Sequence, residues 1–451
     1  MSSWKKYKLG ELLELVIDHR GKTPKKLGFD DFHSNGYPVL SAKHVKTSGL
    51  VNLDVMRFAN QEMYEKWMKI PTKKGDIVLT SEAPLGELFY IDGSTQYLLG
   101  QRVFGLRTKA NLINPMYLFA WLSSPEGQSA LQARATGSTV QGIKQSELLN
   151  IELSIPDLIE QEKVAEILFN LNNKIQLNTQ INQTLEQIAQ TIFKSWFIDF
   201  DPVHAKANAL ASGQTAEQAT QAAMAVISGK NTQELHRLQT ANPEQYQQLW
   251  EIAEAFPSGF DEEGVPRGWE ERELSYLFEF LSGAQPPKSE HIYEEKEGYE
   301  RFIQNRDYSN DNHKTYIPIS KKNKRCTEKD ILMDKYGEAG KVRYGIKGAY
   351  NVALAKIVPQ KDNLREFLRS YFTQDKIRNY LSSSSMASTR NSLNSTTFTR
   401  MKVIVPNDFL LSTFDKLANE KIDKILQIKQ ENIELSKLRD YLLPKLLSGE
   451  V

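Results

Sequence analysis

Two stretches of the chain carry apolar residues at helical spacing. Within 159–203 and within 408–451, leucines, isoleucines and other apolar residues recur every three or four positions. Asn178 and Asn182 interrupt the first of these stripes. A narrow apolar stripe of this kind is typical of the seam of a coiled coil. The pattern predicts two long helices, and because neither has a domain of its own to lie on, we expect them to pair with each other.

The start of the first helix and the asparagines inside the stripes give two finer expectations. Asp157 is placed to cap the helix, with Glu160 in the first turn, where a negative charge is favourable. Asn182 and Asn432 stand at equivalent positions of the two stripes. Buried asparagines would fix the register of the pair, whereas asparagines on a solvated face would not. The sequence leaves both interpretations open.

The segments before the two helices mix strand and helix signals. Asp76–Thr80 and Asp330–Met333 are short apolar runs, each followed by a polar, glycine-containing loop, and are predicted as buried strands. Asn114-Pro115 opens a predicted helix, because proline fits the first helical position. We therefore predict mixed α/β domains over 1–158 and 268–407.

The two domain-and-helix segments are copies of each other. Residues 137–156 match residues 387–406 at an offset of 250, and the same offset continues into the helices. A repeat of this length is a duplicated domain rather than a solenoid unit. The predicted fold class is α+β, with two mixed α/β domains, each followed by a long α-helix, in an internal repeat.

The stretch 204–267 separates the two copies. Its main part, 205–256, is rich in alanine and glutamine and predicts a small helical hairpin broken near Ser228-Gly229 and Asn242-Pro243. The proline and glycine content of the remainder predicts a linker, after which the second domain begins.

Composition narrows the class of protein. The chain has 451 residues, of which 40% are hydrophobic and 25% charged, as in ordinary soluble proteins of two or three domains. No apolar run approaches the roughly 20 residues that span a bilayer, so no membrane partner is expected. Cys326 is the single cysteine, which excludes an intramolecular disulfide and fits a cytoplasmic location. The 7 histidines are scattered, so no metal site is expected.

Charge is distributed unevenly along the chain. Residues 1–158 carry 19 Lys and Arg against 16 Asp and Glu, and residues 268–407 carry 24 against 18. Both α/β domains are therefore basic, by +3 and +6, while 159–267 has a net charge of −7 and 408–451 of −1. A solvated surface would explain one small excess, but its recurrence in both copies favours a nucleic-acid backbone as the ligand.

The sequence contains no convincing catalytic motif. Asn114-Pro115-Met116-Tyr117 resembles the Asn-Pro-Pro-Tyr element of amino-methyltransferases, but it follows no apolar strand and no glycine-rich cofactor loop. Gly337–Lys341 lacks the glycine spacing and the Ser or Thr of a phosphate-binding P-loop. Paired acids beside a nuclease-like lysine are also missing, so a binding protein is favoured over an enzyme.

The order of the segments and several phrases resemble one known family. The phrases are Gly137-Ser138-Thr139-Val140-Gln141-Gly142-Ile143, Ile155-Pro156 with Glu160-Gln161 and Lys174-Ile175, Phe193-Lys194-Ser195-Trp196-Phe197-Ile198-Asp199-Phe200-Asp201-Pro202-Val203, Pro266-Arg267-Gly268-Trp269 and Leu442-Leu443-Pro444-Lys445-Leu446-Leu447-Ser448-Gly449. Together they resemble the specificity subunit of type I restriction-modification systems. The resemblance covers nearly the whole chain except the alanine- and glutamine-rich stretch.

This resemblance implies a function and a set of partners. Each α/β domain would be a target-recognition domain that reads one half of a split, asymmetric site in double-stranded DNA. The helices would pair as an antiparallel coiled coil with pseudo-twofold symmetry, set the gap between the half-sites and dock two methyltransferase subunits. Restriction-translocase subunits would join this core. The chain itself would be non-catalytic and bind no cofactor, with S-adenosylmethionine, ATP and Mg on the partner subunits.

Candidate DNA contacts are polar residues in loops that recur in both copies, because Arg, Lys, Asn and Gln read base edges while Lys, Arg, Ser and Thr hold phosphates. In the first copy they are Arg20, Lys22, Lys43, His44, Gln101, Arg102, Ser138, Thr139, Gln141 and Lys144. In the second copy they are Asn305, Arg306, Lys341, Arg343, Tyr344, Lys347, Ser388, Thr389, Arg390 and Asn391.

Two other classes of function stay open at this point. The long helices and the modest charge also fit a coiled-coil scaffold that binds only proteins. A DNA-methyltransferase or nuclease fused to recognition domains is the second alternative, against which the missing cofactor and metal motifs argue. Methylation or cleavage of DNA by the chain alone would support that second alternative.

Overall fold

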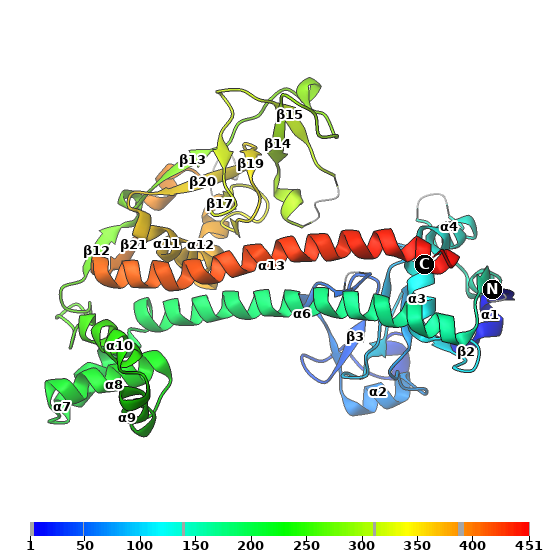
Figure 1. The fold of residues 1–451 in the computed structure, drawn as a ribbon, viewed down its shortest axis with the longest axis horizontal. Helices are drawn as coiled ribbons and strands as arrows, with labels where there is room; N and C mark the ends of the chain where they lie inside the picture. The colour runs from blue at the N-terminus through cyan, green and yellow to red at the C-terminus, as the bar shows by residue number, and fades with distance from the viewer. Residues whose placement is uncertain (1–3, 48, 138–139, 310–312, 387–391, 451) are drawn as a thin grey trace. The chain divides into compact units, whose positions relative to one another are not determined.

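A computed structural model describes residues 4–47, 49–137, 140–309, 313–386 and 392–450 (Figure 1). Contacts divide the chain into two compact units, one made of residues 1–179 with 430–451 and the other of residues 180–429. Each unit therefore contains one α/β domain together with one part of each long helix.

The first unit is built on a four-stranded antiparallel sheet. Its strand order is β2 (Leu13–Asp18), β10 (Val103–Thr108), β7 (Ile77–Thr80), β8 (Leu88–Tyr90). The smaller sheets are β1 (Lys5–Lys8) with β11 (Glu152–Ile155), β6 (Phe58–Ala59) with β3 (Tyr37–Leu40) and β9 (Leu98–Leu99), and β4 (Val45–Lys46) with β5 (Gly49–Leu50). The helices are α1 (Leu9–Leu12), η1 (Lys25–Leu27), η2 (Leu53–Val55), α2 (Gln61–Trp67), α3 (Pro115–Ser123), α4 (Pro125–Ala133) and α5 (Gln145–Leu149).

The second unit repeats this architecture. Its main sheet has the order β13 (Phe278–Ser282), β20 (Leu354–Pro359), β17 (Ile331–Asp334), β18 (Val342–Arg343). The smaller sheets are β12 (Glu270–Glu273) with β21 (Lys402–Val405), and β15 (Tyr316–Pro318), β14 (Tyr299–Ile303), β19 (Gly348–Tyr350) and β16 (Arg325–Cys326). The helices of this domain are η3 (Leu274–Tyr276), η4 (Lys288–Glu290), η5 (Asn305–Tyr308), η6 (Asp362–Leu364), α11 (Arg365–Thr373), α12 (Asp375–Met386) and η7 (Ser395–Phe398).

Strand register confirms the internal repeat. Leu106 pairs with Ile77 in the first main sheet, and Ile357 pairs with Ile331 in the second. The turns after the two inner strands also match, because Gly86 and Gly340 both adopt positive φ angles, of 95° and 90°. The predicted α+β fold with a duplicated domain is therefore confirmed.

One end of each main sheet gathers the loops that matter for function. In the first unit, Thr80 at the end of β7 pairs with Val103 at the start of β10, and Phe104 pairs with Asp18 at the end of β2. The loops that follow Asp18 and Thr80 and the turn that precedes Val103 therefore emerge at the same edge. The second sheet has the same arrangement, since Leu354 pairs with Asp334 and Ala355 with Ser282.

Helix α3 supports the main sheet of the first unit and begins as predicted. The Asn114 side chain accepts hydrogen bonds from the backbone N–H groups of Met116 (2.9 Å) and Tyr117 (3.3 Å), with Pro115 in the first turn. The residues from Met116 to Leu122 are all buried, because the helix lies between the sheet and the long helix that follows. In Figure 1, α11 and α12 cover the sheet of the second domain in the same manner.

The long helices are α6 (Leu158–Phe197) and α13 (Asp408–Ser448). Asp157 caps α6, accepting from the N–H of Glu160 at 3.1 Å, as predicted. In the first unit the helices run antiparallel, since Asn178 contacts Asn432 while Asn172 contacts Arg439.

The long helices also pack on the domains that precede them, which we did not expect. Val164, Ala165 and Leu168 of α6 belong to the core of the first domain. Leu410, Leu411, Phe414 and Ala418 of α13 belong to the core of the second. The start of each helix is therefore part of a domain core, and the expectation that the helices have only each other as partners was wrong.

The insert between the copies forms four helices rather than the predicted hairpin. They are α7 (Asp201–Ala211), α8 (Ala216–Ser228), α9 (Thr232–Ala241) and α10 (Pro243–Ala255). The predicted breaks at Ser228-Gly229 and Asn242-Pro243 are present, but a further break before Ala216 and the helix that starts at Asp201 were missed. None of the helices that the structure describes combines the length and apolar character needed to cross a membrane.

Candidate nucleic-acid interface

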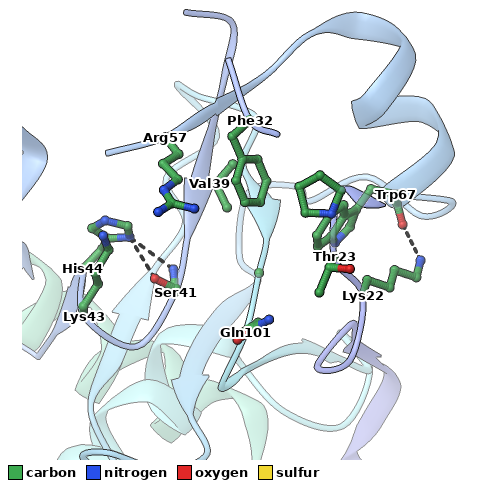
Figure 2. Close-up of a pocket in the computed structure, with 12 residues that line it drawn as sticks. Lys22, Thr23, Phe32, Val39, Ser41, Lys43, His44, Arg57, Trp67 and Gln101 are labelled. Atoms are coloured by element: carbon green, nitrogen blue, oxygen red, sulfur yellow. Dashed lines mark hydrogen bonds between the residues drawn. The ribbon is translucent and has the colours of Figure 1, made fainter. Parts of the chain in front are cut away.

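Four of the candidate DNA contacts line one pocket in the first domain. Lys22 follows β2, Lys43 and His44 follow β3, and Gln101 lies in the turn before β10, so three separate segments bring them together (Figure 2). The pocket has a volume of about 260 Å³. The strand order brings these residues close together, and their proximity could not be predicted from the sequence.

The pocket has an apolar floor and a basic rim. Phe32, Val39 and Trp67 supply apolar surface, and the ring centroids of Phe32 and Trp67 are 5.8 Å apart. Trp67 is fixed because its indole N–H donates to the Leu99 carbonyl at 3.0 Å. Arg57 adds a third cation to Lys22 and Lys43, and none of the described lining residues is acidic. A planar apolar group that carries a negative charge matches this chemistry.

Lys22 is held in place by the end of helix α2. Its ammonium group donates to the Trp67 carbonyl at 2.6 Å, where the helix dipole favours a positive charge. Burial, and then the nearby Lys69, lower the pKa of Lys22 below its ordinary value. The charge is therefore positioned at the pocket wall rather than free in solvent.

His44 is a structural residue of this pocket and not an exposed contact, which corrects our prediction. Only 2% of its surface is exposed, and its Nδ1 accepts from the Ser41 N–H at 3.2 Å. Burial, followed by the charge of Lys43, lowers the pKa of the imidazole. A neutral His44 shapes the turn that presents Lys43, whose own side chain is exposed.

A second hollow of about 180 Å³ is lined by further residues at the same end of the main sheet. Two of its lining residues, Arg20 and Lys144, are candidate DNA contacts, and Ser81 and Glu82 also line it. The Arg20 guanidinium donates to Asp18 at 2.9 and 2.8 Å and lies 4.0 Å from the Phe104 ring centroid. Because two of its N–H groups already donate to Asp18, Arg20 contributes mainly positive charge to the hollow.

Arg102 and Gln141 complete the described candidates of the first copy. The Arg102 Nε lies 3.1 Å from the Glu82 Oε1, beside the second hollow. Gln141 is exposed and precedes Gly142, which lines that hollow. Ser138 and Thr139, which were also predicted, lie outside the described residues.

The candidates of the second copy are less concentrated. Lys347 and Arg306 are exposed, and an Arg306 Nη lies 3.4 Å from the Thr315 hydroxyl. Lys341 pairs with Glu338 at 2.7 Å. Asn305 belongs to η5 next to Arg306. The predicted loop residues Ser388, Thr389, Arg390 and Asn391 lie outside the described residues.

Arg343 is an interior residue and not an exposed DNA contact. Its guanidinium bonds Asp334 at 2.7 Å and Glu338 at 2.8 Å, and its side chain is 9% exposed. Burial raises the pKa of Asp334, against the opposing effect of Arg343. The position of Arg343 on β18, next to a buried strand, was the signal against a role in binding.

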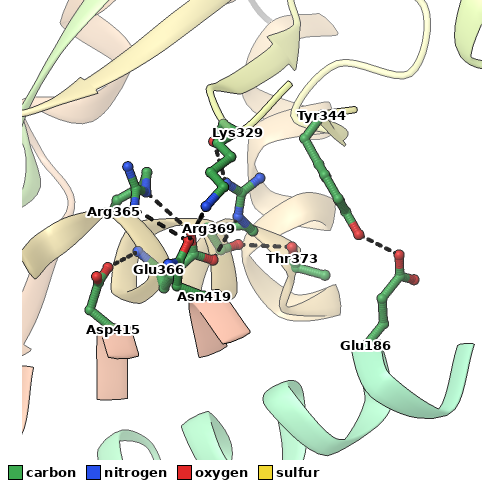
Figure 3. Close-up of polar contacts among 9 residues, drawn as sticks. All are labelled: Glu186, Lys329, Tyr344, Arg365, Glu366, Arg369, Thr373, Asp415 and Asn419. Atoms are coloured by element: carbon green, nitrogen blue, oxygen red, sulfur yellow. Dashed lines mark hydrogen bonds and ion pairs between the residues drawn. The ribbon is translucent and has the colours of Figure 1, made fainter. Parts of the chain in front are cut away.

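Tyr344 likewise anchors the second domain to the long helices (Figure 3). Its hydroxyl donates to Glu186 of α6 at 2.5 Å. Its ring lies between Arg369 and Lys429, 4.7 and 4.4 Å from their charged groups. Because its hydroxyl and ring already make these contacts inside the unit, Tyr344 has a structural role, and its role as a DNA contact stays a prediction.

Some residues that the sequence did not single out line the first pocket, and another stands at the equivalent strand end of the second domain. Arg57 and Trp67 lie upstream of the region where the two copies align well, so comparing the copies could not reveal them. Lys335 follows β17 as Ser81 follows β7, and its ammonium donates to the Ser282 hydroxyl at 2.9 Å. The offset of 254 between the two inner strands would have located Lys335.

Two α/β domains of repeated architecture, each followed by a long helix, with basic pockets at the strand ends of the first domain, define a duplicated recognition protein. A family model described as "Type I restriction modification DNA specificity domain" matches residues 1–187 and 266–439. The chain therefore belongs to the family of type I restriction-modification specificity subunits, which recognise DNA sequence.

Individual relatives agree with this assignment. The chain is 33% identical to the HindI specificity subunit of Haemophilus influenzae, with 100% of each protein covered. It is 27% identical to the MjaIX specificity subunit of Methanocaldococcus jannaschii, covering 84% of this chain and 78% of that protein. The fold resembles the S subunit of M. genitalium, with a TM-score of 0.53 at 16% identity, covering 99% and 96% of the two chains.

Proposed function

We propose that this chain directs a type I restriction-modification complex to a split, asymmetric DNA site. Each α/β domain reads one half-site, and the paired helices set the unread gap between them. The observation that carries this proposal is the pocket of Lys22, Lys43, Arg57 and Gln101. Its cations and apolar floor suit one nucleotide of DNA, with the phosphate at the rim and the sugar or base on the floor.

The proposed partners are two methyltransferase subunits. Exposed apolar residues recur at equivalent places of the long helices: Ile159 and Phe409 are 67% and 49% exposed, and Ile188 and Leu438 are 40% and 45% exposed. Each unit contains one residue of each pair. Repeated surfaces of this kind favour two identical partners over a single asymmetric one. Restriction-translocase subunits join the assembled core in this proposal.

The chain is non-catalytic in this proposal and works in the cytoplasm. S-adenosylmethionine, ATP and Mg stay with the partner subunits. The described part of the chain contains no cluster of three potential metal ligands among His, Cys, Asp and Glu. The scaffold alternative is disfavoured by family membership and by the three cations of the pocket.

The test is to co-express the chain with its methyltransferase subunit and map modified adenines by long-read sequencing. A split motif with two unlike halves is expected. Lys43→Ala together with Arg57→Ala should weaken binding to any duplex and flatten its salt dependence, because both cations face a phosphate. A matched double substitution of Lys25 and Lys26, exposed cations outside the pocket, is the control. A continuous palindrome as the motif would rule the proposal out.

A further inference from the structure

Arg102 and Glu82 form an exposed ion pair at the end of the main sheet of the first domain. The Arg102 Nε lies 3.1 Å from the Glu82 Oε1, and the two side chains are 55% and 43% exposed. The Arg107–Asp76 pair of the same sheet is different, since its side chains are 10% and 1% exposed and it serves the core. The Arg102–Glu82 pair is placed where a ligand can reach both members.

The backbone holds Arg102 in an unusual conformation. Its φ angle is 63°, in the left-handed region that costs a residue with a side chain about 1 kcal/mol or more. The carbonyl of Arg102 accepts from the Ser81 N–H at 2.9 Å, which ties the turn to the loop that carries Glu82. The two side chains are therefore presented together by two loops that are hydrogen-bonded to each other.

The surroundings favour DNA over a structural role. Glu82 lines the hollow of about 180 Å³ together with the cations Arg20 and Lys144. The fork of Arg20 is occupied by Asp18. The Nη groups of Arg102, by contrast, donate no hydrogen bond to any of the described residues, so these donors are open to a ligand.

We propose that Arg102 and Glu82 together read one G·C base pair in the half-site of the first domain. In the major groove, an arginine fork donates to the O6 and N7 of guanine, and a glutamate accepts from the N4 amino group of cytosine. Guanine O6 and cytosine N4 are neighbours within one base pair. With the Arg102 Nε 3.1 Å from the Glu82 Oε1, the two side chains lie side by side, as the contact with two neighbouring bases requires. This inference rests on the proposed function, which it extends from a reading domain to two residues and one base pair.

The second domain lacks this pair. The Lys335 N–H donates to the Ala353 carbonyl at 2.8 Å, just as the Ser81 N–H donates to Arg102, so Ala353 and Tyr336 are the counterparts of Arg102 and Glu82. Tyr336 is 38% exposed and Ala353 has no polar side-chain atom. The second domain therefore has no charged pair that would select a G·C base pair at the corresponding position of its half-site. This difference contributes to the asymmetry of the DNA site.

The test uses the full chain in complex with its methyltransferase subunits, once the wild-type motif is mapped. Duplexes in which each base pair of the motif is replaced in turn are compared in competition binding. Replacing one G·C pair should weaken binding by the wild-type complex roughly 10- to 100-fold. Arg102→Ala and Glu82→Gln should each reduce that penalty to about threefold or less, at that position and in that half-site only.

Two variants keep the outcome interpretable. Arg102→Lys retains the charge and lacks the fork, so it should relax the same position even if Arg102→Ala impairs folding. Arg134→Ala is the matched control, because Arg134 forms a similar pair with Glu147 at 3.3 Å, with side chains 37% and 40% exposed. This control should leave every penalty unchanged.

Several results would overturn the inference while leaving the proposed function intact. They are a first half-site without any G·C requirement, unchanged penalties in all Arg102 and Glu82 variants, or equal weakening on every duplex including unrelated DNA, which would make Arg102 a phosphate contact. A wild-type complex without a split motif would instead refute the proposed function itself. The two failures are therefore distinguishable.

Discussion

Helices α3 and α11 occupy the same place in the two copies but meet the following long helix with different chemistry. In the first copy, Met116 and Phe119 are buried at 7% and 8% exposure in an apolar core shared with α6. At the offset of 250 their counterparts are Glu366 and Arg369, which are 1% and 4% exposed. An apolar contact in one copy is thus a buried ion pair in the other.

The ion pair of the second copy is part of a wider network (Figure 3). The Arg369 Nε donates to Glu366 at 2.8 Å, and an Arg369 Nη donates to the Lys329 carbonyl at 2.6 Å. The Glu366 N–H donates to Asp415 of α13 at 3.2 Å, and burial raises the pKa of Asp415. The comparison teaches that the fold retains the shape of this interface while its charge changes. At this interface, buried charges depend on one another in the second copy, where they replace the apolar side chains of the first.

The largest expected effect comes from breaking this ion pair. Glu366→Met removes the carboxylate and leaves Arg369 buried without its partner, which should destabilise the second unit by about 3–5 kcal/mol. Met116→Leu, at the equivalent place in the first copy, should cost less than about 1.5 kcal/mol. Hydrogen exchange of peptides from each unit measures the two effects separately.

Replacing both residues of the ion pair by their counterparts from the first copy should restore the stability lost in Glu366→Met. Glu366→Met with Arg369→Phe recreates the pair Met116 and Phe119, and we expect it to regain most of the stability lost in the single variant. A double variant as unstable as Glu366→Met alone would show that the network, and not the unpaired charge, holds the interface.

The sequence predicted the repeated frame well because packing repeats. The strands at Ile77 and Ile331, the Asn114 cap and the two long helices follow from apolar periodicity and capping chemistry, which are local. The candidate site was predicted less well. Arginine is a residue type that often contacts DNA, yet Arg343 is buried because it pairs with Asp334 on the neighbouring strand.

Long-range pairing of this kind cannot be read from a single segment. The convergence of Lys22, Lys43 and Gln101 likewise depends on strand order, as does the pairing of Arg102 with Glu82. Asp157 could be assigned a role from its neighbours in the chain, whereas Tyr344 could not, because its partners Glu186 and Lys429 lie on the long helices far away in the sequence.

A second contrast concerns the aspartate before each inner strand. Asp76 pairs with Arg107 at 2.8 Å with side chains 1% and 10% exposed, whereas Asp330 pairs with Lys356 at 3.2 Å with side chains 27% and 21% exposed. Asp76→Asn should therefore cost about 3 kcal/mol. Asp330→Asn should cost about 1 kcal/mol or less. Thermal unfolding of both variants checks the ranking, and equal losses would contradict the role of burial.

Acid should affect the first unit more than the second through His19. Burial, and then the charge of Lys22, lower the pKa of His19 from 6.5 to about 4. As the pH falls below 6.5, the imidazole of His19 binds a proton in the unfolded chain but stays neutral in the folded unit until the pH approaches 4. The free energy of unfolding is therefore highest above pH 6.5 and decreases as the pH falls toward 4. Because the ring is half-buried, we expect a loss of about 1 kcal/mol.

The variant His19→Gln should remove this acid sensitivity. Ser282 pairs with Ala355 as Asp18 pairs with Phe104, so Gly283 stands where His19 does and the second unit has no titratable side chain at this position. Urea unfolding at pH 7 and pH 5 should show a smaller difference for the variant than for the wild type. An identical difference in stability between the two pH values in both proteins would show that His19 does not cause the acid sensitivity.

The smallest contrast lies between two asparagines of α6. Asn178 is 1% exposed, and its amide donates to Asn432 at 2.9 Å and to Glu431 at 3.0 Å. Asn182 is 8% exposed, and its Oδ1 has no hydrogen-bond partner among the described residues. The bond between Asn178 and Asn432 therefore fixes the register of the helices in its unit. Of the two asparagines in the question that the sequence left open, Asn432 takes part in this bond, whereas Asn182 is buried at a cost in stability.

Leucine should therefore have opposite effects at the two positions. Asn178→Leu leaves Asn432 without its donor, and we expect a loss of about 1 kcal/mol. Asn182→Leu removes an unsatisfied polar atom and adds apolar contact, so a gain of about 0.5–1 kcal/mol is expected. Hydrogen exchange along α6 separates the two changes. A gain in stability at both positions would show that the hydrogen bonds of Asn178 contribute less than the burial of its amide costs. The register would then be set by other contacts between the helices, such as the ion pair of Lys174 with Glu431, whose charged atoms are 3.3 Å apart.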